Sequence, residues 1–222
     1  MNNKNTEEFF EKLLGFGPDW GVASIELLDD GSTVELGLEH RREGAVECPE
    51  CGKVCALHDH ARERRWRHLD MLQYETRIRA RIPRSDCPEC GVHQIKVPWA
   101  EPNVRYTLLF EAHAIEVLQA ARSTTQACDL LGIGWSTADT IMKRAVQRGL
   151  ERREIEELPR VGMDEKSFRA RHRYITSLCD LDRGRVLEVV EGRTEEKAVE
   201  LLKSRLAKTR SNAEFLMTMN LD

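Results

Sequence analysis

Apolar and polar residues alternate along several stretches in the first half of the chain, and this period of two predicts β-strands. The clearest case is residues 73–82, where Thr76, Ile78 and Ala80 alternate with charged side chains. Such a pattern is typical of a strand with one buried and one solvated face. A short helix is predicted before these strands, at residues 6–14. Further strands are predicted at residues 22–28, 33–38 and 64–69.

The period changes to that of a helix after Pro102. Leu109, Ala112 and Ile115 recur at the spacing of one helix face, which predicts a helix over residues 106–121. The other elements predicted beyond it are helix up to about residue 156, strands at residues 160–164, 173–180, 186–191 and 214–221, and a helix at residues 194–206. Strands, then helices, then strands again indicate a multidomain α+β protein.

Two near-identical cysteine pairs interrupt the first β-rich region, Cys48-Pro-Glu-Cys51 and Cys87-Pro-Glu-Cys90. Each pair directs two thiolates towards one point, and two such turns complete the tetrahedral site that Zn²⁺ prefers. A β-hairpin that leaves one pair and returns to the other would span the residues between them, as in a zinc ribbon. We therefore predict a structural Zn²⁺ held by Cys48, Cys51, Cys87 and Cys90, in a closed site that has no open position for catalysis.

The remaining cysteines and two nearby histidines allow other interpretations. Seven cysteines without a secretory signal argue against a disulfide framework. Cys55, His58 and His60 lie close enough in sequence to compete as metal ligands. Cys128 and Cys179 sit in apolar patterns and are predicted to be small core residues. Redox-active dithiols or buried free thiols remain alternatives for the two pairs.

Residues 123–146 have the order of a helix-turn-helix. Ser123 or Thr124 is suited to cap a short first helix, Gly132 to make the turn, and Ser136 to cap the second helix. The first turns of that second helix would then read DNA in the major groove. An ordinary helical hairpin shares this pattern. The DNA contacts predicted on the second helix are Trp135, Ser136, Thr137, Asp139, Thr140, Lys143 and Arg144.

A second candidate DNA surface is a local run of positive charge. The chain as a whole has a net charge of −4, but residues 60–84 contain eight arginines against three acids. A confined phosphate-binding face would produce such a run, although a solvated strand surface would also do so. The predicted contacts in this run are Arg64, Arg65, Arg77, Arg79 and Arg81.

The candidate chemistry beyond residue 160 is that of a carboxylate. Asp164 follows the short apolar stretch Val161-Gly162-Met163, so we predict it at the end of a strand. A ribonuclease-H-like sheet presents the first acid of a phosphoryl-transfer site in this way, and oxygen ligands suit Mg²⁺. Taken alone, Asp164 is better explained as an acid in a turn at the end of a strand.

The paired CxxC motifs, the helix-turn-helix and the motif Gly162-Met-Asp-Glu-Lys-Ser-Phe168 together resemble insertion-sequence transposases of the ISL3 type, over residues 22–222. The resemblance implies that the zinc-binding domain and the helix-turn-helix recognise the terminal inverted repeats of the element in double-stranded DNA. It also implies a ribonuclease-H-like domain with a metal-dependent Asp-Asp-Glu triad, which cuts and joins DNA, and a homodimer. Asp164 matches the first acid of that triad.

The second acid departs from the family pattern Ala-Met-Asp-Met. The comparable stretch is residues 217–222, in which Asn220 occupies the position of the acid. Asp222 can serve as the second catalytic acid only in a shifted register, and the third acid would come later than residue 222. We therefore interpret the chain as a truncated or inactive transposase. A non-catalytic, zinc-dependent DNA-binding regulator derived from a transposase is the alternative, and a zinc-ribbon protein that binds another protein is a third.

The predicted domain order combines these motifs. It is a zinc-binding domain at residues 1–100 with a zinc-ribbon-like β module at about 45–95, a helix-turn-helix domain at 101–157, and part of an α/β ribonuclease-H-like domain at 158–222. No apolar run approaches the length of about 18 residues that a membrane span needs. The polar, acidic N-terminus does not resemble a signal peptide, so we expect a cytoplasmic protein.

Overall fold

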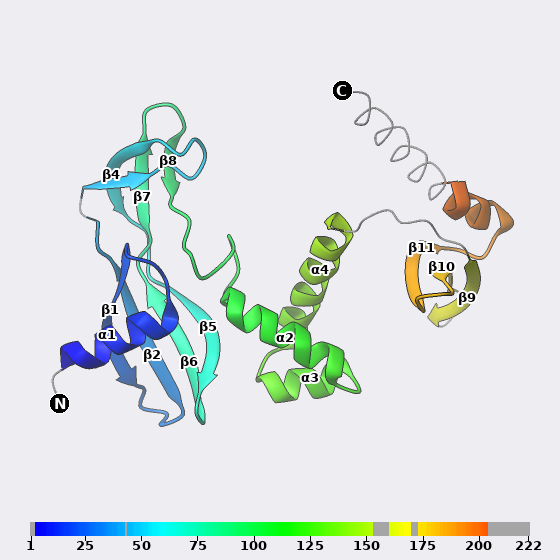
Figure 1. Ribbon diagram of the computed structural model, residues 1–222, viewed down its shortest axis with the longest axis horizontal. Coiled ribbons are helices and arrows are strands. Elements are labelled where there is room, and N and C mark those ends of the chain that lie inside the picture. The colour runs from blue at the N-terminus through cyan, green and yellow to red at the C-terminus, as the bar shows by residue number, and fades with distance from the viewer. Residues whose placement is uncertain (1–2, 43, 153–159, 170–172, 204–222) are drawn as a thin grey trace. The chain divides into compact units, whose positions relative to one another are not determined.

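The computed structural model divides the chain into two compact units, Met1–Gln147 and Arg148–Asp222 (Figure 1). Each unit contains strands and helix, which confirms the predicted α+β composition. Within the described part of the chain, no helix is long and apolar enough to cross a membrane. The described residues are 3–42, 44–152, 160–169 and 173–203.

The first unit begins with a helix and a four-stranded sheet of order β1-β2-β6-β5. β1 and β2 form an antiparallel hairpin, β2 and β6 run parallel, and β6 and β5 form a second antiparallel hairpin. Asp30 closes the first hairpin, because its carboxylate accepts the amide hydrogens of Ser32 and Thr33 at 2.8 Å. The predicted helix and strands are confirmed with these bounds: α1 Asn3–Leu14, β1 Trp20–Leu27, β2 Thr33–His40, β5 Arg64–Met71 and β6 Tyr74–Ala80.

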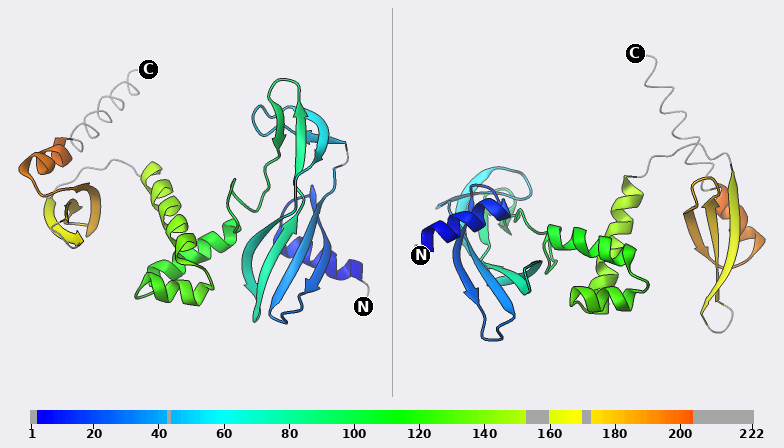
Figure 2. Two further views of the ribbon diagram at one scale, coloured as in Figure 1. Left: turned by 180° about the vertical axis from the view of Figure 1, so that it is seen from behind. Right: turned by 60° about the horizontal axis from the view of Figure 1, so that its bottom comes forward.

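One face of this sheet carries the hydrophobic core of the unit. The ring of Trp99 meets the rings of Trp20 and Trp66 edge-on, with centroids 4.6 and 5.5 Å apart. The helix α1 lies against the same core through Phe10 and Leu14 (Figure 2). Since side chains alternate along a strand, burial of this face turns the charged residues of β5 and β6 to the opposite face.

A second, antiparallel sheet of order β3-β4-β7-β8 carries the cysteine pairs. The hairpin predicted between the two pairs exists as β5 and β6, but it belongs to the first sheet instead of the zinc ribbon. The reason is its parallel pairing with β2, which places Ile78 opposite Leu36, both completely buried. The second sheet has these bounds: β3 Ala45–Glu47, β4 Val54–His60, β7 Pro83–Cys87 and β8 Gly91–Gln94.

Three helices complete the first unit and confirm the predicted helical region: α2 Leu108–Ala120, α3 Thr124–Leu131 and α4 Trp135–Glu151. Thr107 and Ser123 cap α2 and α3 by accepting amide hydrogens in the first turn. Gly132 ends α3 in the left-handed conformation, with φ of 63°, which favours glycine over residues that carry a Cβ atom. The chain before α2 pairs with the edge of β5, where the Arg67 amide donates to the Arg105 carbonyl oxygen at 2.8 Å.

The second unit contains an antiparallel sheet of order β11-β10-β9 and a helix at residues 195–203. Its small core joins buried Leu178 and Leu187 of the sheet to Leu201 of that helix. The predicted strand at residues 214–221 lies outside the described residues. The strands have these bounds: β9 Val161–Arg169, β10 Arg173–Asp180 and β11 Arg185–Glu191.

Candidate metal centre and nucleic-acid interface

Four cysteine sulfur atoms meet between the turn that joins β3 to β4 and the turn that joins β7 to β8. The Sγ atoms of Cys48, Cys51, Cys87 and Cys90 all lie within 4.8 Å of one another, and those of Cys51 and Cys87 are 3.7 Å apart. Sulfurs bound tetrahedrally to zinc at about 2.3 Å would be separated by roughly 3.8 Å. The residues therefore fit this ion. In the described part of the chain, no other group of three or more His, Cys, Asp or Glu side chains is placed to share a metal.

The electrostatics of this cluster favour a bound cation. Amide hydrogen bonds from Cys90 and Glu89 lower the pKa of the Cys87 thiol to about 6. Hydrogen bonding to Cys51, together with burial, raises the pKa of the Cys90 thiol to about 12. Thiols this close oppose one another's ionisation, and a divalent cation removes that opposition by neutralising the thiolates.

The other candidate ligands lie outside the group of four. Cys55 is buried against the cluster, but its thiol donates to the carbonyl oxygen two residues earlier at 3.3 Å. His58 and His60 belong to β4 and do not join the group. Cys128 is buried in α3, as expected of a small core residue, and Cys179 is half-buried in β10.

The helix-turn-helix presents the beginning of α4 to solvent. Ala138 and Ile141 are completely buried and fix one face of this helix in the core. Trp135 is 59% exposed, and Ser136 and Thr140 are exposed as well. A helix face with buried small and aliphatic residues and an exposed aromatic and polar start is compatible with insertion into a DNA groove.

The start of α4 differs from the prediction at one residue. The helix begins at Trp135, and the amides of Thr137 and Ala138 donate to the Gly134 carbonyl oxygen at 3.0 and 3.2 Å. Ser136 therefore lies inside the first turn and is not the cap. Its carbonyl oxygen accepts the Thr140 hydroxyl at 2.8 Å.

Two of the predicted contact residues on α4 pair with acids of the first unit. Lys143 pairs with Asp139 at 2.7 Å, and the Lys143 side chain remains 75% exposed. Arg144 lies 3.3 Å from the buried carboxylate of Glu111 in α2. Arg144 thus helps to hold α4 against α2, whereas Lys143 is accessible from solvent.

The arginines of β5 and β6 form an array on the outer face of the first sheet. Arg65 lies directly opposite Arg79, and Arg67 lies directly opposite Arg77. Like charges in this arrangement destabilise a sheet unless counter-charges lie between them. Glu35 of β2 supplies one, because its buried carboxylate lies 2.7 Å from both Arg65 and Arg79. Part of the predicted phosphate-binding charge is therefore neutralised within the sheet.

Arg64 and Arg81 differ from this array. Arg64 is half-buried, donates to the Val104 carbonyl oxygen at 3.0 Å, and lies 5.0 Å from the centroid of the Trp66 ring. Arg81 is exposed just after the end of β6. Arg64 therefore serves packing, while the Arg81 side chain is open to solvent.

A groove of about 660 Å³ separates the outer face of β5 and β6 from the start of α4. Its cationic lining is Arg65, Arg67, Arg77 and Arg105, and Glu75 is the acid among its lining residues. Neither Arg67 nor Arg105 was among the contacts predicted from the sequence. Arg67 belongs to the same run of positive charge from which Arg65 was predicted, so that signal was available. Arg105 lies in a segment without periodicity, and only the pairing of this segment with β5 brings it to the groove.

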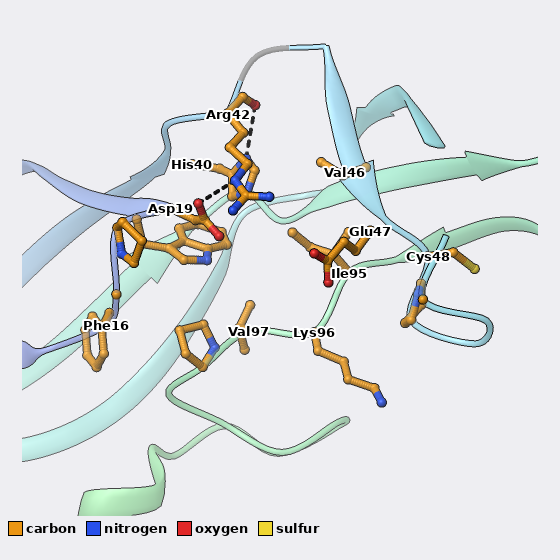
Figure 3. Close-up of a pocket in the computed structure, with 16 residues that line it drawn as sticks. Phe16, Asp19, His40, Arg42, Val46, Glu47, Cys48, Ile95, Lys96 and Val97 are labelled. Atoms are coloured by element: carbon orange, nitrogen blue, oxygen red, sulfur yellow. Dashed lines mark hydrogen bonds and ion pairs between the residues drawn. The ribbon is translucent and has the colours of Figure 1, made fainter. Parts of the chain in front are cut away.

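A second hollow, of about 490 Å³, lies between the two sheets of the first unit (Figure 3). Its charges balance, because Asp19 and Glu47 oppose Arg42 and Lys96 along the lining. Asp19 and Arg42 also form an ion pair at 2.5 Å, drawn as a dashed line in Figure 3. The charge of this hollow therefore favours neither an anion nor a cation.

Asp164 is exposed on one face of the sheet in the second unit. It stands opposite Ser177 in the interior of β9 and not at a strand end as predicted, because the strand continues to Arg169. No pair of further acids lies close enough to share a metal with Asp164 in the described residues. Asp222, the other predicted catalytic acid, lies outside them.

Comparison with known families accounts for most of the chain in three consecutive segments. A model described as the zinc-finger of transposases IS204, IS1001, IS1096 and IS1165 matches residues 45–90, and so includes all four clustered cysteines. A model of the helix-turn-helix domain of transposase family ISL3 matches residues 95–146. A transposase model of the same family matches residues 161–219. The chain belongs to the ISL3 family of transposases. The zinc-finger match and the four-cysteine cluster together support a structural zinc in this ISL3-family chain.

Curated relatives agree with the family. The transposase for insertion sequence element IS1557 of Mycobacterium tuberculosis is 33% identical over 191 residues, which cover 82% of this chain and 42% of the relative. The transposase for insertion sequence element IS1001 of Bordetella parapertussis is 25% identical over 187 residues, covering 83% of this chain and 46% of the relative. The ISL3-family chain thus spans less than half the length of either relative. No solved structure matches it.

Proposed function

We propose that this chain binds the terminal inverted repeats of an insertion sequence through its first unit and supplies the first acid of the DNA-cutting site through its second unit. The observation that carries the proposal is the solvent-exposed start of α4 beside a groove lined by four arginines. Such a surface suits base edges and phosphates together, since base contacts specify a sequence and phosphate contacts position the protein.

In this proposal the zinc ion has a structural role. Cys48, Cys51, Cys87 and Cys90 are its ligands, and the ion fixes the two turns that close the second sheet. The hairpin of β5 and β6, which bears the arginine array, lies in the chain between β4 and β7. The pairing of His60 in β4 with Pro83 in β7 closes the base of this hairpin, so an ion that stabilises the second sheet also supports the hairpin.

The DNA contacts divide between α4 and the first sheet. Trp135, Ser136, Thr137, Thr140 and Lys143 reach into the major groove, where side chains near the start of a recognition helix contact base edges. The sheet arginines and Arg144 contribute positive charge near the backbone. The proposed backbone residues of the sheet are Arg65, Arg77, Arg79 and Arg81. Arg64 is not among them, because its side chain is held by the Val104 carbonyl oxygen and the Trp66 ring.

Catalysis needs more than the described residues provide. Two-metal phosphoryl transfer uses clustered carboxylates that hold Mg²⁺, which activates the attacking oxygen and stabilises the leaving one. Asp164 is one such acid. The family register places Asn220 at the position of the second acid, so Asp222 supplies that acid only in a shifted register. A lone carboxylate does not hold Mg²⁺ for this chemistry, so the proposal gives the chain strand cleavage and joining only when further acids complete the site.

The decisive test is binding to DNA taken from the two ends of the genetic element that encodes the chain. Fluorescence anisotropy should give a Kd at least about tenfold lower for end duplexes than for shuffled duplexes of equal composition, the effect of roughly one specified base contact. Equal affinity for both would overturn the proposal. A chromatographic mass measurement on the DNA complex checks the proposed homodimer.

Incubation of the same duplexes with Mg²⁺ or Mn²⁺ tests the catalytic part. Metal-dependent nicking that Asp164→Asn abolishes, without loss of binding, would assign the acid. End-specific binding without nicking would instead establish the DNA-binding regulator, the alternative function. Asp182→Asn is a matched control on the same unit, since this acid pairs with Arg160 away from β9 residue Asp164.

A further inference from the structure

The groove between the first sheet and α4 is built from three segments that are far apart in sequence. The outer face of β5 and β6 forms one wall, residues 103–106 continue it, and the start of α4 forms the other wall. The residues that α4 contributes include three hydroxyl side chains, Ser136, Thr137 and Thr140. Cationic and hydroxyl groups therefore face one another across a single open groove.

The charge of the groove is strongly positive for an acidic chain. Four arginines and one glutamate line it, which gives a formal charge of three positive units, whereas the whole chain carries −4. Arg65 and Arg67 share their charge with acids outside the lining, Glu35 and Asp70, at 2.7 and 2.6 Å. Arg77 pairs with Glu75 of the lining itself, so among the described residues of the groove Arg105 is the arginine whose charge has no paired acid.

Arg77 and Arg105 are the accessible cations of this lining. The Arg77 side chain is 45% exposed and pairs with Glu75 at 2.7 Å. Arg105 is exposed and forms no side-chain ion pair or hydrogen bond with the described residues. Its backbone is nevertheless fixed by two hydrogen bonds to Arg67 of β5. The Arg105 carbonyl oxygen accepts the Arg67 amide, and the Thr107 amide donates to the Arg67 carbonyl oxygen at 2.9 Å.

The opposite wall offers hydrogen-bond donors to an anion. Gly134 precedes α4 and has no side chain to accept the first amides of the helix, unlike the capping hydroxyls of Thr107 and Ser123. The amides at the start of α4 therefore form the positive end of the helix dipole, which attracts phosphate, and the Ser136 hydroxyl lies beside them. Arginines on one wall and a helix start on the other suit a row of phosphates and not a single carboxylate.

We infer that this groove holds the sugar-phosphate backbone of the same duplex whose bases α4 reads. The inference rests on the proposed DNA-binding function and adds to it a defined backbone site with Arg77 and Arg105 as its phosphate ligands. The sheet and the helix-turn-helix then act as one reader, because the pairing of residues 105–107 with β5 fixes the distance between them. A phosphate held by Arg105 sets the register of α4 in the major groove.

The test compares single substitutions in the full chain. The probe is a fluorescein-labelled duplex of mixed sequence, about three helical turns long, titrated at several NaCl concentrations. Arg105→Gln and Arg77→Gln should each reduce the slope of log Kd against log salt by about 0.9 and raise Kd about eightfold at 0.1 M salt. Arg105→Lys, which keeps the charge, should restore most of the slope.

Arg62→Gln is the matched control, because Arg62 is exposed just before β5 but does not line the groove. It should leave the slope unchanged. Unchanged slopes for both groove variants, with normal DNA binding by the parent chain, would overturn the inference while the proposed function stands. Loss of all DNA binding by the parent chain would instead sink the proposed function. Identical thermal unfolding of the variants excludes misfolding as the cause of a lost slope.

Discussion

Thr107 and His68 link the helix-turn-helix to the first sheet, and replacing Thr107 by valine measures that link. The Thr107 hydroxyl accepts the Phe110 amide at 3.2 Å and shares a hydrogen bond of 2.9 Å with the buried His68 ring. Valine keeps the shape but removes both bonds. Loss of the helix cap costs about 1 kcal/mol, and a buried ring nitrogen without a partner costs about 1–3 kcal/mol. Together they predict that Thr107→Val lowers the free energy of unfolding by about 2–4 kcal/mol.

Urea unfolding followed by tryptophan fluorescence is the suitable assay, because Trp20, Trp66 and Trp99 report on the core that the link supports. Ser123→Ala is the matched control. Ser123 caps α3 in the same way, but its hydrogen bond is exposed, so only about 1 kcal/mol should be lost. A cost of Thr107→Val no larger than that of Ser123→Ala would refute the stabilising role of the buried pair. A His68→Leu background should reduce the cost of Thr107→Val to that of the cap alone.

Two further predictions concern the metal and the pH. Cys87→Ser, or a chelator, should release zinc and unfold β3, β4, β7 and β8 while β5 and β6 stay paired with β2; hydrogen exchange that leaves the second sheet protected without zinc would contradict this. Burial and the charge of Arg67 lower the pKa of His68 from about 6.5 to about 4, so the stability due to neutral His68 is complete above pH 6.5. Between pH 6.5 and pH 4 the free energy of unfolding should therefore fall by up to roughly 1.4 kcal/mol per pH unit. An equally steep pH dependence of unfolding in His68→Gln would disprove the assignment of this effect to His68.

Local patterns predicted the elements well because they record local physics. The alternation around Thr76 and Ile78 reflects one buried face, and Ser123 caps α3 because its hydroxyl reaches an amide three residues away. The grouping of the four cysteines could be predicted equally well, since each CxxC turn brings its own two sulfurs together. What these features share is that a few neighbouring residues determine the geometry.

Features that depend on distant parts of the chain could not be predicted from such local patterns. The parallel pairing of β2 with β6 takes the hairpin away from the zinc ribbon, and no residue within either strand records its partner. Arg105 reaches the groove only because the segment before α2 pairs with β5. The interior position of Asp164 was missed because polar residues after it still continue the strand, supported by pairing with β10. Ser136 was wrongly predicted as the cap because the helix begins one residue earlier, at Trp135, directly after Gly134.

The parallel ladder between β2 and β6 has a consequence for the order in which the protein assembles during synthesis. All four strands of the first sheet have left the ribosome once Ala80 emerges, before the second cysteine pair leaves it. We expect this sheet to form around the first pair and the metal to be captured afterwards, once Cys87 and Cys90 emerge. The helix-turn-helix is translated after both the first sheet and the second cysteine pair. It would then dock onto the edge of β5, which has already formed.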